Sequence, residues 1–313
     1  MPSPVIRYWK KKIVLWKPEA TYATDPVPTG VANYIEARNV TLSPAEFDVE
    51  DRQIVRESMG NTSKLITGER LKLSFDIALA ASGTLGTVPK LGTLLRGSGW
   101  AEDITAGVKV EYTLISGGFE SGTFYVRYDG VRHKGLGTRG TSSLKLDKGI
   151  PVAHFELTAL FVTPVDEVPD ATTRTGWPIE KPVNAANTLV CKVNAVDSWY
   201  SKFEFAQGNV VAHDNFPGGY EAISIKDRQP TASITMLAPT LAVFDPFALA
   251  RAATNIPIQV VHGATAGNKV QVDLTALITG VAYEDINGTT GYALTLSPDD
   301  PTDSNAEAKL TFL

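Results

Sequence analysis

One glycine-rich run combines residue types and spacing that could do chemistry. Residues 135–140 read GLGTRG, which satisfies the G-x-G-x-x-G pattern of phosphate-binding loops. That chemistry requires a helix to begin at the motif, because the free N–H groups of its first turn bind the phosphate. Residues 141–146 alternate between polar and apolar types instead, which indicates another strand. The run therefore predicts a glycine-rich hairpin and not a nucleotide site.

The residues that most often bind metals or act as nucleophiles are dispersed along the chain. Cys191 is the single cysteine, so neither an intrachain disulfide nor a cysteine-based zinc cluster can form. None of the four histidines stands at helical ligand spacing to another histidine or to the cysteine. His154 faces the polar side of a strand, and we expect His133, His213 and His262 to be solvated in or beside turns.

Two further patterns are weak. Residues 299–303 resemble part of a calcium loop, but the glycine and the distal glutamate of an EF-hand are missing, which favours a surface turn. No G-x-S-x-G or other local nucleophile motif is present, whereas a Ser/His/Asp triad assembled in space stays open. We therefore predict no catalytic, cofactor-binding or metal-binding residues, and we expect that the protein is not an enzyme.

Strands must make up most of the scaffold. Residues 71–77, 124–128 and 154–160 place an apolar side chain at every second position, which is the pattern of half-buried strands. Helical patterns are scarce, with one short helix predicted over residues 89–96 and a second over residues 245–253, the latter with an aspartate N-cap followed by proline. These elements predict a mainly β fold.

Length and charge limit the function classes. The 313 residues predict about two domains. A formal net charge of -5 argues against a surface that grips nucleic acid through its phosphates. The apolar run Ile13–Trp16 after the N-terminal lysines is too short for a signal peptide, and no stretch approaches the length of a membrane span. We therefore expect synthesis in the cytosol and no membrane span.

The spacing of the elements suggests an internal repeat. Arg70 precedes Pro89 by 19 residues and Arg228 precedes Pro246 by 18, and each interval holds a strand and leads into a short helix. The proline-rich segment Pro164–Val183 separates the two. We predict an N-terminal arm over residues 1–32, a first domain over 33–165, a linker over 166–184 and a second domain over 185–313. A chance likeness of two β-rich halves is the alternative.

Residues 33–164 also resemble a known family. The stretches that carry the resemblance are residues 37–44 (ARNVTLSP), 82–96 (SGTLGTVPKLGTLLR) and 128–134 (YDGVRHK). In this order they resemble the tail tube proteins of long-tailed bacteriophages, in particular those of Mu-like siphophages of Pseudomonas. Residues 165–313 are similar to the family more weakly, mainly at Asp227–Thr231.

The resemblance implies tail-tube-type β-sandwich domains, each with one short flanking helix, whose inner sheets join in rings that stack into a tube. Together with the internal repeat, it predicts two such domains in tandem. A ring of six domain positions would then be a trimer with pseudo-sixfold symmetry. Six chains per ring, with the second domain as an outer decoration, is the alternative. The resemblance also implies a place in the virion tail after synthesis in the host bacterial cytoplasm, contacts with other tail proteins, and DNA that passes through the lumen without specific binding.

Other functions stay open at this point. A tube terminator or a distal tail protein would also form rings. A two-domain β-sandwich that binds a glycan or receptor is a different class, and the tryptophans of the chain suggest it. The ordinary role of such dispersed tryptophans is packing in a core or an interface. They are Trp9, Trp16, Trp100, Trp177 and Trp199.

Two charged segments are candidates for contacts between stacked rings. Residues 44–67 form a long predicted loop with an excess of acidic residues, and the N-terminal segment mixes basic with aromatic residues. We expect both to become ordered only between rings. The candidates are Arg7, Trp9, Lys10, Lys11, Lys12 and Trp16 in the N-terminal segment, and Glu46, Asp48, Glu50, Asp51, Arg52 and Arg56 in the loop.

Overall fold

The computed structural model describes residues 6–300, 302 and 304–313. Strands make up 54% of the chain and helices 4%, so the prediction of a mainly β fold is confirmed. Within the described residues, all strands except those of one hairpin belong to a single hydrogen-bonded network. No helix in the described ranges is long and apolar enough to cross a membrane.

The N-terminal half, residues 6–166, contains one sheet in the order β3-β4-β9-β8-β7-β1-β2. Helix α1 (Gly92–Gly97) follows β4, and the hairpin of β5 (Trp100–Thr105) and β6 (Lys109–Leu114) follows the helix. The sheet strands are β1 (Lys12–Pro18), β2 (Tyr34–Ile35), β3 (Arg38–Asp51), β4 (Lys64–Ala78), β7 (Gly122–Tyr128), β8 (Val131–Lys145) and β9 (Val152–Asp166).

The C-terminal half, residues 185–313, repeats this plan with the order β12-β15-β18-β17-β16-β10-β11. Helix α2 (Pro246–Arg251) follows β15, and β13 (Asn209–Phe216) and β14 (Tyr220–Arg228) form a separate hairpin. The other strands are β10 (Val190–Val193), β11 (Val196–Asp197), β12 (Tyr200–Ala206), β15 (Thr231–Leu237), β16 (Asn255–His262), β17 (Val270–Ile286), β18 (Thr289–Pro298) and β19 (Ala308–Phe312).

The two sheet orders correspond strand for strand. β3 and β4 occupy the places of β12 and β15, and β9, β8, β7 and β1 occupy the places of β18, β17, β16 and β10. Each helix follows the second strand of its sheet order. The halves differ in their additions, because the β5–β6 hairpin has no counterpart in the C-terminal half and β19 has none in the N-terminal half.

The predicted alternating strands lie where the sequence placed them. Leu71, Leu73, Phe75 and Ile77 of β4 are each at most 1% exposed, and the residues between them face away from the core. Phe75 stacks on Phe155 of β9 with ring centroids 5.8 Å apart. Successive side chains of a strand point to opposite faces, so this pattern gives each central sheet one buried face and one polar face.

The two helices are short, as predicted, but they begin differently. Asp245 caps α2, since its carboxylate accepts hydrogen bonds from the backbone N–H groups of Phe247 and Ala248 at 3.0 and 2.9 Å. Helix α1 begins at Gly92, three residues after the predicted proline. A β-carbon at Gly92 would lie 2.2 Å from the Tyr112 hydroxyl oxygen, so the glycine makes room for that ring beneath the helix.

Strand β1 lies within the segment that the sequence assigned to an N-terminal arm. It pairs with β7 along its whole length, and Val14, Leu15 and Trp16 are buried. The Trp16 ring occupies space that two glycines leave open, because β-carbons at Gly97 and Gly122 would lie 2.6 and 2.4 Å from it. The arm predicted over residues 1–32 therefore contains a core strand.

The glycine run is not a hairpin. Residues 131–145 form one continuous strand, β8, whose pairing with β9 shifts register between Leu136 and Arg139. The turn lies upstream at Asp129 and Gly130, whose φ angles are 36° and 95°. The glycines serve a bulge, a local irregularity that bends a strand. Gly140 also permits close packing, because a β-carbon there would meet the Glu156 carbonyl oxygen at 2.3 Å.

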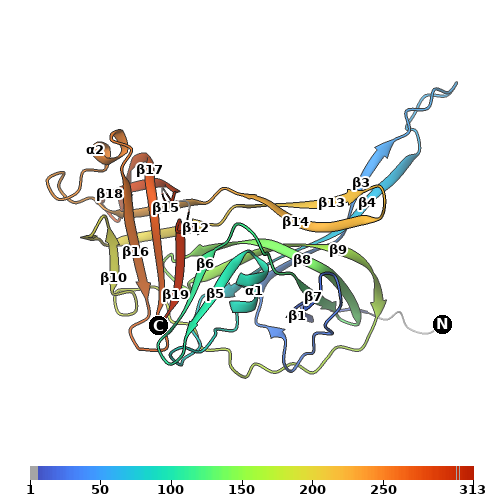
Figure 1. The fold of residues 1–313 in the computed structure, drawn as a ribbon, viewed down its shortest axis with the longest axis horizontal. Coiled ribbons are helices and arrows are strands. Elements are labelled where there is room, and N and C mark those ends of the chain that lie inside the picture. The colour runs from blue at the N-terminus through green and yellow to red at the C-terminus, as the bar shows by residue number, and fades with distance from the viewer. Residues whose placement is uncertain (1–5, 301, 303) are drawn as a thin grey trace.

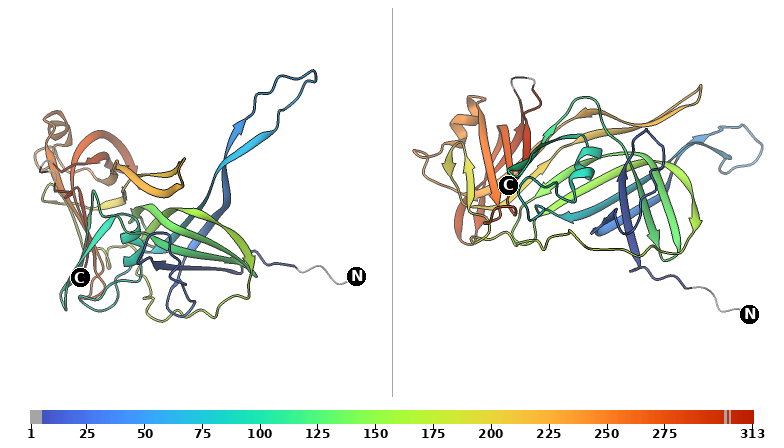
Figure 2. Two further views of the ribbon diagram at one scale, coloured as in Figure 1. Left: turned by 45° about the vertical axis from the view of Figure 1, so that its right-hand side comes forward. Right: turned by 60° about the horizontal axis from the view of Figure 1, so that its bottom comes forward.

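The two halves lie side by side along the long axis of the molecule (Figure 1). The β3–β4 hairpin projects from one end, and α2 lies at the opposite end (Figures 1 and 2). The connecting residues 167–189 run along the side away from the hairpins. They are tied to the N-terminal half by an ion pair between Arg38 and Glu180 and by a 3.3 Å hydrogen bond from the Trp177 indole N–H to the Tyr34 carbonyl.

Candidate assembly surfaces

The two halves are joined by backbone pairing between β8 and β12. Ser143, Leu144 and Lys145 lie opposite Ala206, Phe205 and Glu204. The pairing extends by one bond on each side, from the Gln207 N–H to the Ser142 carbonyl and from the Leu146 N–H to the Phe203 carbonyl, both at 2.9 Å. We call these two segments, Ser142–Leu146 and Phe203–Gln207, the joint.

Side chains contact one another across the joint on both faces of the sheet. Leu144 and Phe205 are buried on the core side, where Phe205 also meets Trp100 edge-on at 6.2 Å. On the polar face Lys145 and Glu204 form a 2.6 Å ion pair. Past the end of α1, the Asn209 amide donates to the Ser98 carbonyl at 2.7 Å. The joint therefore makes one continuous hydrophobic core across the two halves.

The β13–β14 hairpin belongs to the C-terminal half but lies over the N-terminal half (Figure 1). Arg139 of β8 donates to the Ile223 carbonyl at 2.8 Å, and the Ile223 N–H donates to the Tyr22 hydroxyl oxygen at 2.6 Å. Ile223 and Ile225 are only 0% and 9% exposed as a result. Burial raises the pKa of Tyr22, so the hydroxyl that accepts the hydrogen bond from Ile223 stays neutral.

The joint makes an eight-stranded sheet in the order β3-β4-β9-β8-β12-β15-β18-β17, to which each half contributes four strands. Residues directly opposite each other on neighbouring strands share a face. One row of opposite residues is Thr41, Ser74, Glu156 and Thr141, and another is Lys145, Glu204, Ser233 and Thr295. Both rows are polar, so the face opposite the core is wettable across the whole sheet.

Charges on this polar face pair with one another. Asp76 lies 2.6 Å from His154, and Lys202 lies 3.0 Å from Glu284. The hydrogen bond from Lys202 lowers the pKa of Glu284, which stabilises its charged form. The polar face therefore carries positive and negative charges that balance locally, and it does not carry an excess of one charge.

The two ends of the eight-stranded sheet are open. At one end, β3 pairs only with β4. At the other, residues 280–286 of β17 pair only with β18. Beside this second end, Tyr283 is 68% exposed and forms a cluster with Tyr292 and Phe247 of α2, whose ring centroids lie 5.7 and 6.2 Å from that of Tyr283.

The predicted loop 44–67 is instead the outer part of the β3–β4 hairpin, with strands up to Asp51 and from Lys64. Four apolar side chains on its strands are about half exposed. They are Phe47, Val49, Leu65 and Ile66, with exposed fractions of 44, 49, 53 and 59%. We call residues 44–68 the arm. It is therefore an extended, partly apolar hairpin in the chain as it stands.

The acidic candidates on the arm are largely paired with basic residues of β4. Asp48 lies 2.7 Å from Arg70, and Glu46 lies 2.9 Å from Lys72. Asp51 lies 3.5 Å from Lys64. Nearer the tip, the side chains of Arg52 and Arg56 donate to the Ser63 hydroxyl and to backbone carbonyls, and Glu50 is exposed.

The N-terminal candidates pack on their own half. Arg7 pairs with Asp166 at 2.7 Å, and Lys11 pairs with Asp129 at 3.4 Å. The Lys12 ammonium lies 3.5 Å from the centre of the Trp9 ring, which in turn meets Tyr128. Lys10 is exposed. Trp16 is a core residue, so the prediction that it contributes to a surface contact is wrong.

Among the described residues, no hydrogen bond or ion pair joins the two candidate segments within one chain. The N-terminal segment instead reaches the base of β3, where the Lys12 ammonium lies 3.5 Å from the Val40 carbonyl oxygen. Sequence reasoning missed the joint, because pairing between distant strands leaves no local pattern. One signal was present: the glycines of residues 135–140 mark the bulge that turns β8 toward β12.

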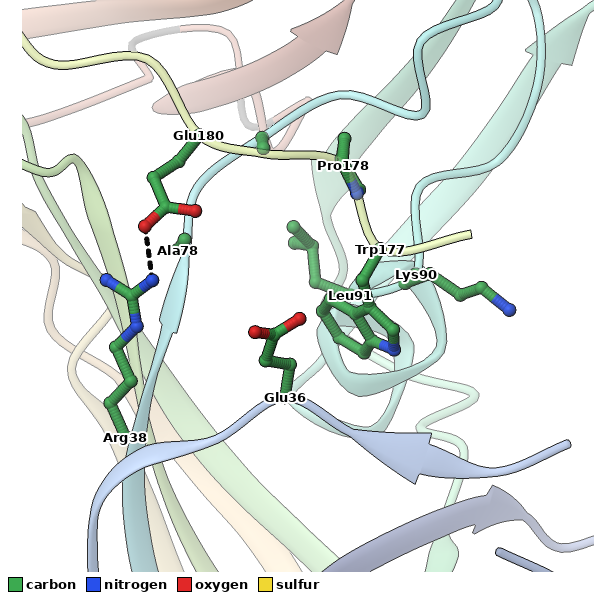
Figure 3. Close-up of a pocket in the computed structure, with 9 residues that line it drawn as sticks. Glu36, Arg38, Ala78, Lys90, Leu91, Trp177, Pro178 and Glu180 are labelled. Carbon is green, nitrogen blue, oxygen red and sulfur yellow. Dashed lines mark hydrogen bonds and ion pairs between the residues drawn. The ribbon is translucent and has the colours of Figure 1, made fainter. Parts of the chain in front are cut away.

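The hollow beneath the connecting segment is too small for a substrate. Figure 3 shows Trp177 beside Leu91 on one side of the hollow and the ion pair of Arg38 with Glu180 on the other. Its volume of about 10 Å³ accommodates about one water molecule. Glu36, at its floor, pairs with Arg174 outside the residues drawn. Three of its charged groups, Glu36, Arg38 and Glu180, thus already have partners.

The histidines differ from the solvated residues expected. His262 is buried, and its ring nitrogens bond to the Thr188 hydroxyl at 2.8 Å and the Lys181 carbonyl at 3.1 Å. The side chain of His213 is 3% exposed and meets Glu221 at 2.9 Å. His154 does face the polar side of its strand. In the described part of the chain no group of three or more His, Cys, Asp or Glu residues is placed to hold a metal ion.

No protein-family model matches the chain, and no curated protein matches it. The arrangement of the molecule is therefore the basis for inferring its function.

Proposed function

We propose that the protein is the tube subunit of a bacteriophage tail, in which rings of the chain stack into the conduit for DNA. The observation that carries the proposal is the eight-stranded sheet with one polar face and an open strand at each end. Open strands at opposite ends of a sheet suit head-to-tail contacts, which close into a ring when their rotation divides a circle.

Two tandem tail-tube-type β-sandwich domains account for the matched strand orders of the two halves. Each half contributes four strands to the shared sheet and one short helix that follows the second of them. Three chains would then bring 24 strands to a ring with six domain positions. Barrels of about 16 to 18 strands already enclose an aqueous channel, so such a ring has room for a lumen.

The polar face of the shared sheet is the surface that we assign to the lumen. Its side chains are wettable, and its charges are paired across neighbouring strands, as Lys145 is with Glu204. A basic wall would hold DNA through its phosphates, whereas a balanced or anionic wall lets it slide. The net charge of -5 agrees with passage of DNA without specific binding.

Electron microscopy of the purified protein tests this function. The expected result is long hollow polymers whose rings have three chains and six similar positions. Single rings that do not stack would favour a terminator or distal tail protein. A chain that remains monomeric at high concentration and binds glycans would contradict the tube and favour a β-sandwich binding protein.

A further inference from the structure

We propose that the joint between the two halves of one chain recurs between chains, with residues 281–285 of β17 paired to residues 40–44 of β3 in a second copy. This inference rests on the proposed ring and names the surfaces that would close it. The second copy is the partner because each open end of the sheet corresponds to one side of a contact that this chain already makes with itself.

A shared bulge aligns the two halves residue by residue. In the N-terminal half, the pair Ser43–Lys72 precedes an irregularity and Glu46–Arg70 follows it. In the C-terminal half, Ala206–Thr231 precedes the break and Asn209–Arg228 follows it. Ser43 therefore corresponds to Ala206. It follows that Val40–Pro44 corresponds to Phe203–Gln207, one side of the joint.

The other side of the joint is aligned by following paired residues from strand to strand across each sheet. The starting point is again the match of Ser43–Lys72 with Ala206–Thr231. The row Phe75, Phe155 and Ser142 corresponds to the row Ile234, Leu294 and Val281. Ser142–Leu146 of β8 therefore corresponds to Val281–Asp285 of β17. A bulge also precedes each segment, between Leu136 and Arg139 in β8 and between Ile278 and Gly280 in β17.

Residues of the joint are buried, whereas the corresponding residues at the open end of the sheet are exposed. This difference is expected if the second contact is made only with another chain. Leu144 is 0% exposed in the joint, whereas its counterpart Tyr283 is 68% exposed. The end of α1 is covered by Asn209 through its bond to Ser98, but of the α2 residues only Pro246 is buried. The aromatic cluster beside β17 is thus placed where the second copy would cover it.

The β13–β14 hairpin and the arm show the same contrast in burial. The β13–β14 hairpin lies on β8 and β9 of the N-terminal half, with Ile223 and Ile225 buried. The arm is the continuation of β3 and β4, as β13 and β14 continue β12 and β15, but its Leu65 and Ile66 remain 53 and 59% exposed. In the proposed joint the arm lies on β17 and β18 of the neighbouring chain and buries these side chains.

The geometry of the chain allows the contact to propagate. The arm and α2 lie at opposite ends of the long axis (Figure 1), so a chain can give its arm to one neighbour and receive an arm from another. Such a heterologous contact leaves no open sheet end once a ring closes.

The single free thiol, Cys191, is buried and is replaced by serine in the test below.

Disulfide trapping tests the joint directly. Ser143 and Ala206 are opposite each other in the observed pairing and lie between its hydrogen-bonded pairs, where α-carbons are about 4.5 Å apart and a disulfide can form. Their counterparts are Ala282 and Ser43. In a Cys191→Ser background, Ala282→Cys with Ser43→Cys should give covalent oligomers under mild oxidation of assembled protein, ending at a closed trimer. Mixing the two single variants should give dimers only.

Two controls fix the meaning of the result. Ser143→Cys with Ala206→Cys should cross-link within one chain, which verifies that the geometry permits the bond. Ala282→Cys with Asp103→Cys, which joins β17 to the edge strand β5, should give no cross-link. Rings or tubes that form without the Ala282–Ser43 disulfide would overturn the joint and leave the tube function standing. A chain that never associates would contradict both.

Discussion

At the scale of single residues, Trp16 shows how the same residue type can belong to a core or to a surface. Trp16 is 2% exposed and fills the space above Gly97 and Gly122, whereas Trp9 is 74% exposed. Trp16→Ala should lower the free energy of unfolding by about 3–5 kcal/mol, because it leaves a large cavity. Trp9→Ala, the matched control, should cost less than about 1 kcal/mol. Urea denaturation measures both, and equal losses would contradict the assignment of Trp16 to the core.

His262 gives the fold a dependence on pH. Burial lowers the pKa of its imidazole, which is neutral between Thr188 and Lys181. Below the unfolded-state pKa of about 6.5, the unfolded chain binds a proton that the folded chain resists, so stability present above that pH is lost as the pH falls.

Denaturation at pH 7.5 and pH 5.5 tests this effect. His262→Gln should be less stable than the natural chain at pH 7.5, since the Thr188 and Lys181 contacts are altered. Its loss of stability between the two pH values should be smaller, because the titrating group is gone. An unchanged loss would show that other groups, such as His133, whose pKa burial also lowers, carry the pH dependence.

At the scale of elements, the arm should matter for assembly and not for folding. Replacing residues 50–65 by a two-residue Asn-Gly turn removes the exposed apolar side chains Ile54, Val55, Met59 and Leu65 but leaves the buried part of β4 intact. We expect a melting temperature within a few degrees of that of the natural chain and no polymers by electron microscopy.

A matched change on the docked hairpin serves as the control. Phe216 and Tyr220 stack at 6.0 Å at the tip of β13–β14 and are 55 and 57% exposed. Replacing both by serine alters a hairpin tip without touching the arm, so assembly should persist. Polymers of normal length from the shortened arm would show that the arm does not join chains.

The sequence predicted those elements whose pattern is local. Alternation located β4, β7 and β9, and the Asp245-Pro246 pair located α2. Strand β1 escaped prediction because its apolar run is short and follows lysines, although pairing with β7 buries it on both faces. Removal of residues 1–18 would therefore delete part of the core.

The assembly surfaces were predictable only in part. The acidic and basic residues near the arm and the N-terminus were found, but the sequence could not show that most of them pair locally, as Asp48 does with Arg70. The joint depends on contacts between residues 57 to 65 positions apart, such as Leu146 with Phe203 and Ser142 with Gln207, and no short window contains such information.

At the scale of the whole molecule, the two halves should fold as one unit despite their matched strand orders. They share backbone pairing at the joint and again between β6 and β19, where Tyr112 meets Phe312 edge-on at 5.7 Å. Separation would expose Leu144, Phe205 and both of these rings to water. Residues 1–184 and 185–313 expressed alone should therefore aggregate, and co-expression should recover a soluble pair.

Thermal and chemical unfolding of the full chain should accordingly follow a single cooperative transition by both fluorescence and circular dichroism. Two well-separated transitions, or a stable monomer from either half, would contradict this expectation and favour independent domains connected by a linker.

The covalent connection of the two halves also changes the kinetics of growth. A contact formed within one chain does not depend on protein concentration, since its partners are held at a high effective concentration. For a ring closed by three such chains, three of six contacts are present before any encounter. The rate of nucleation should then rise with about the third power of concentration, and not with the sixth power expected of six separate subunits, so that assembly would begin at lower chain concentrations.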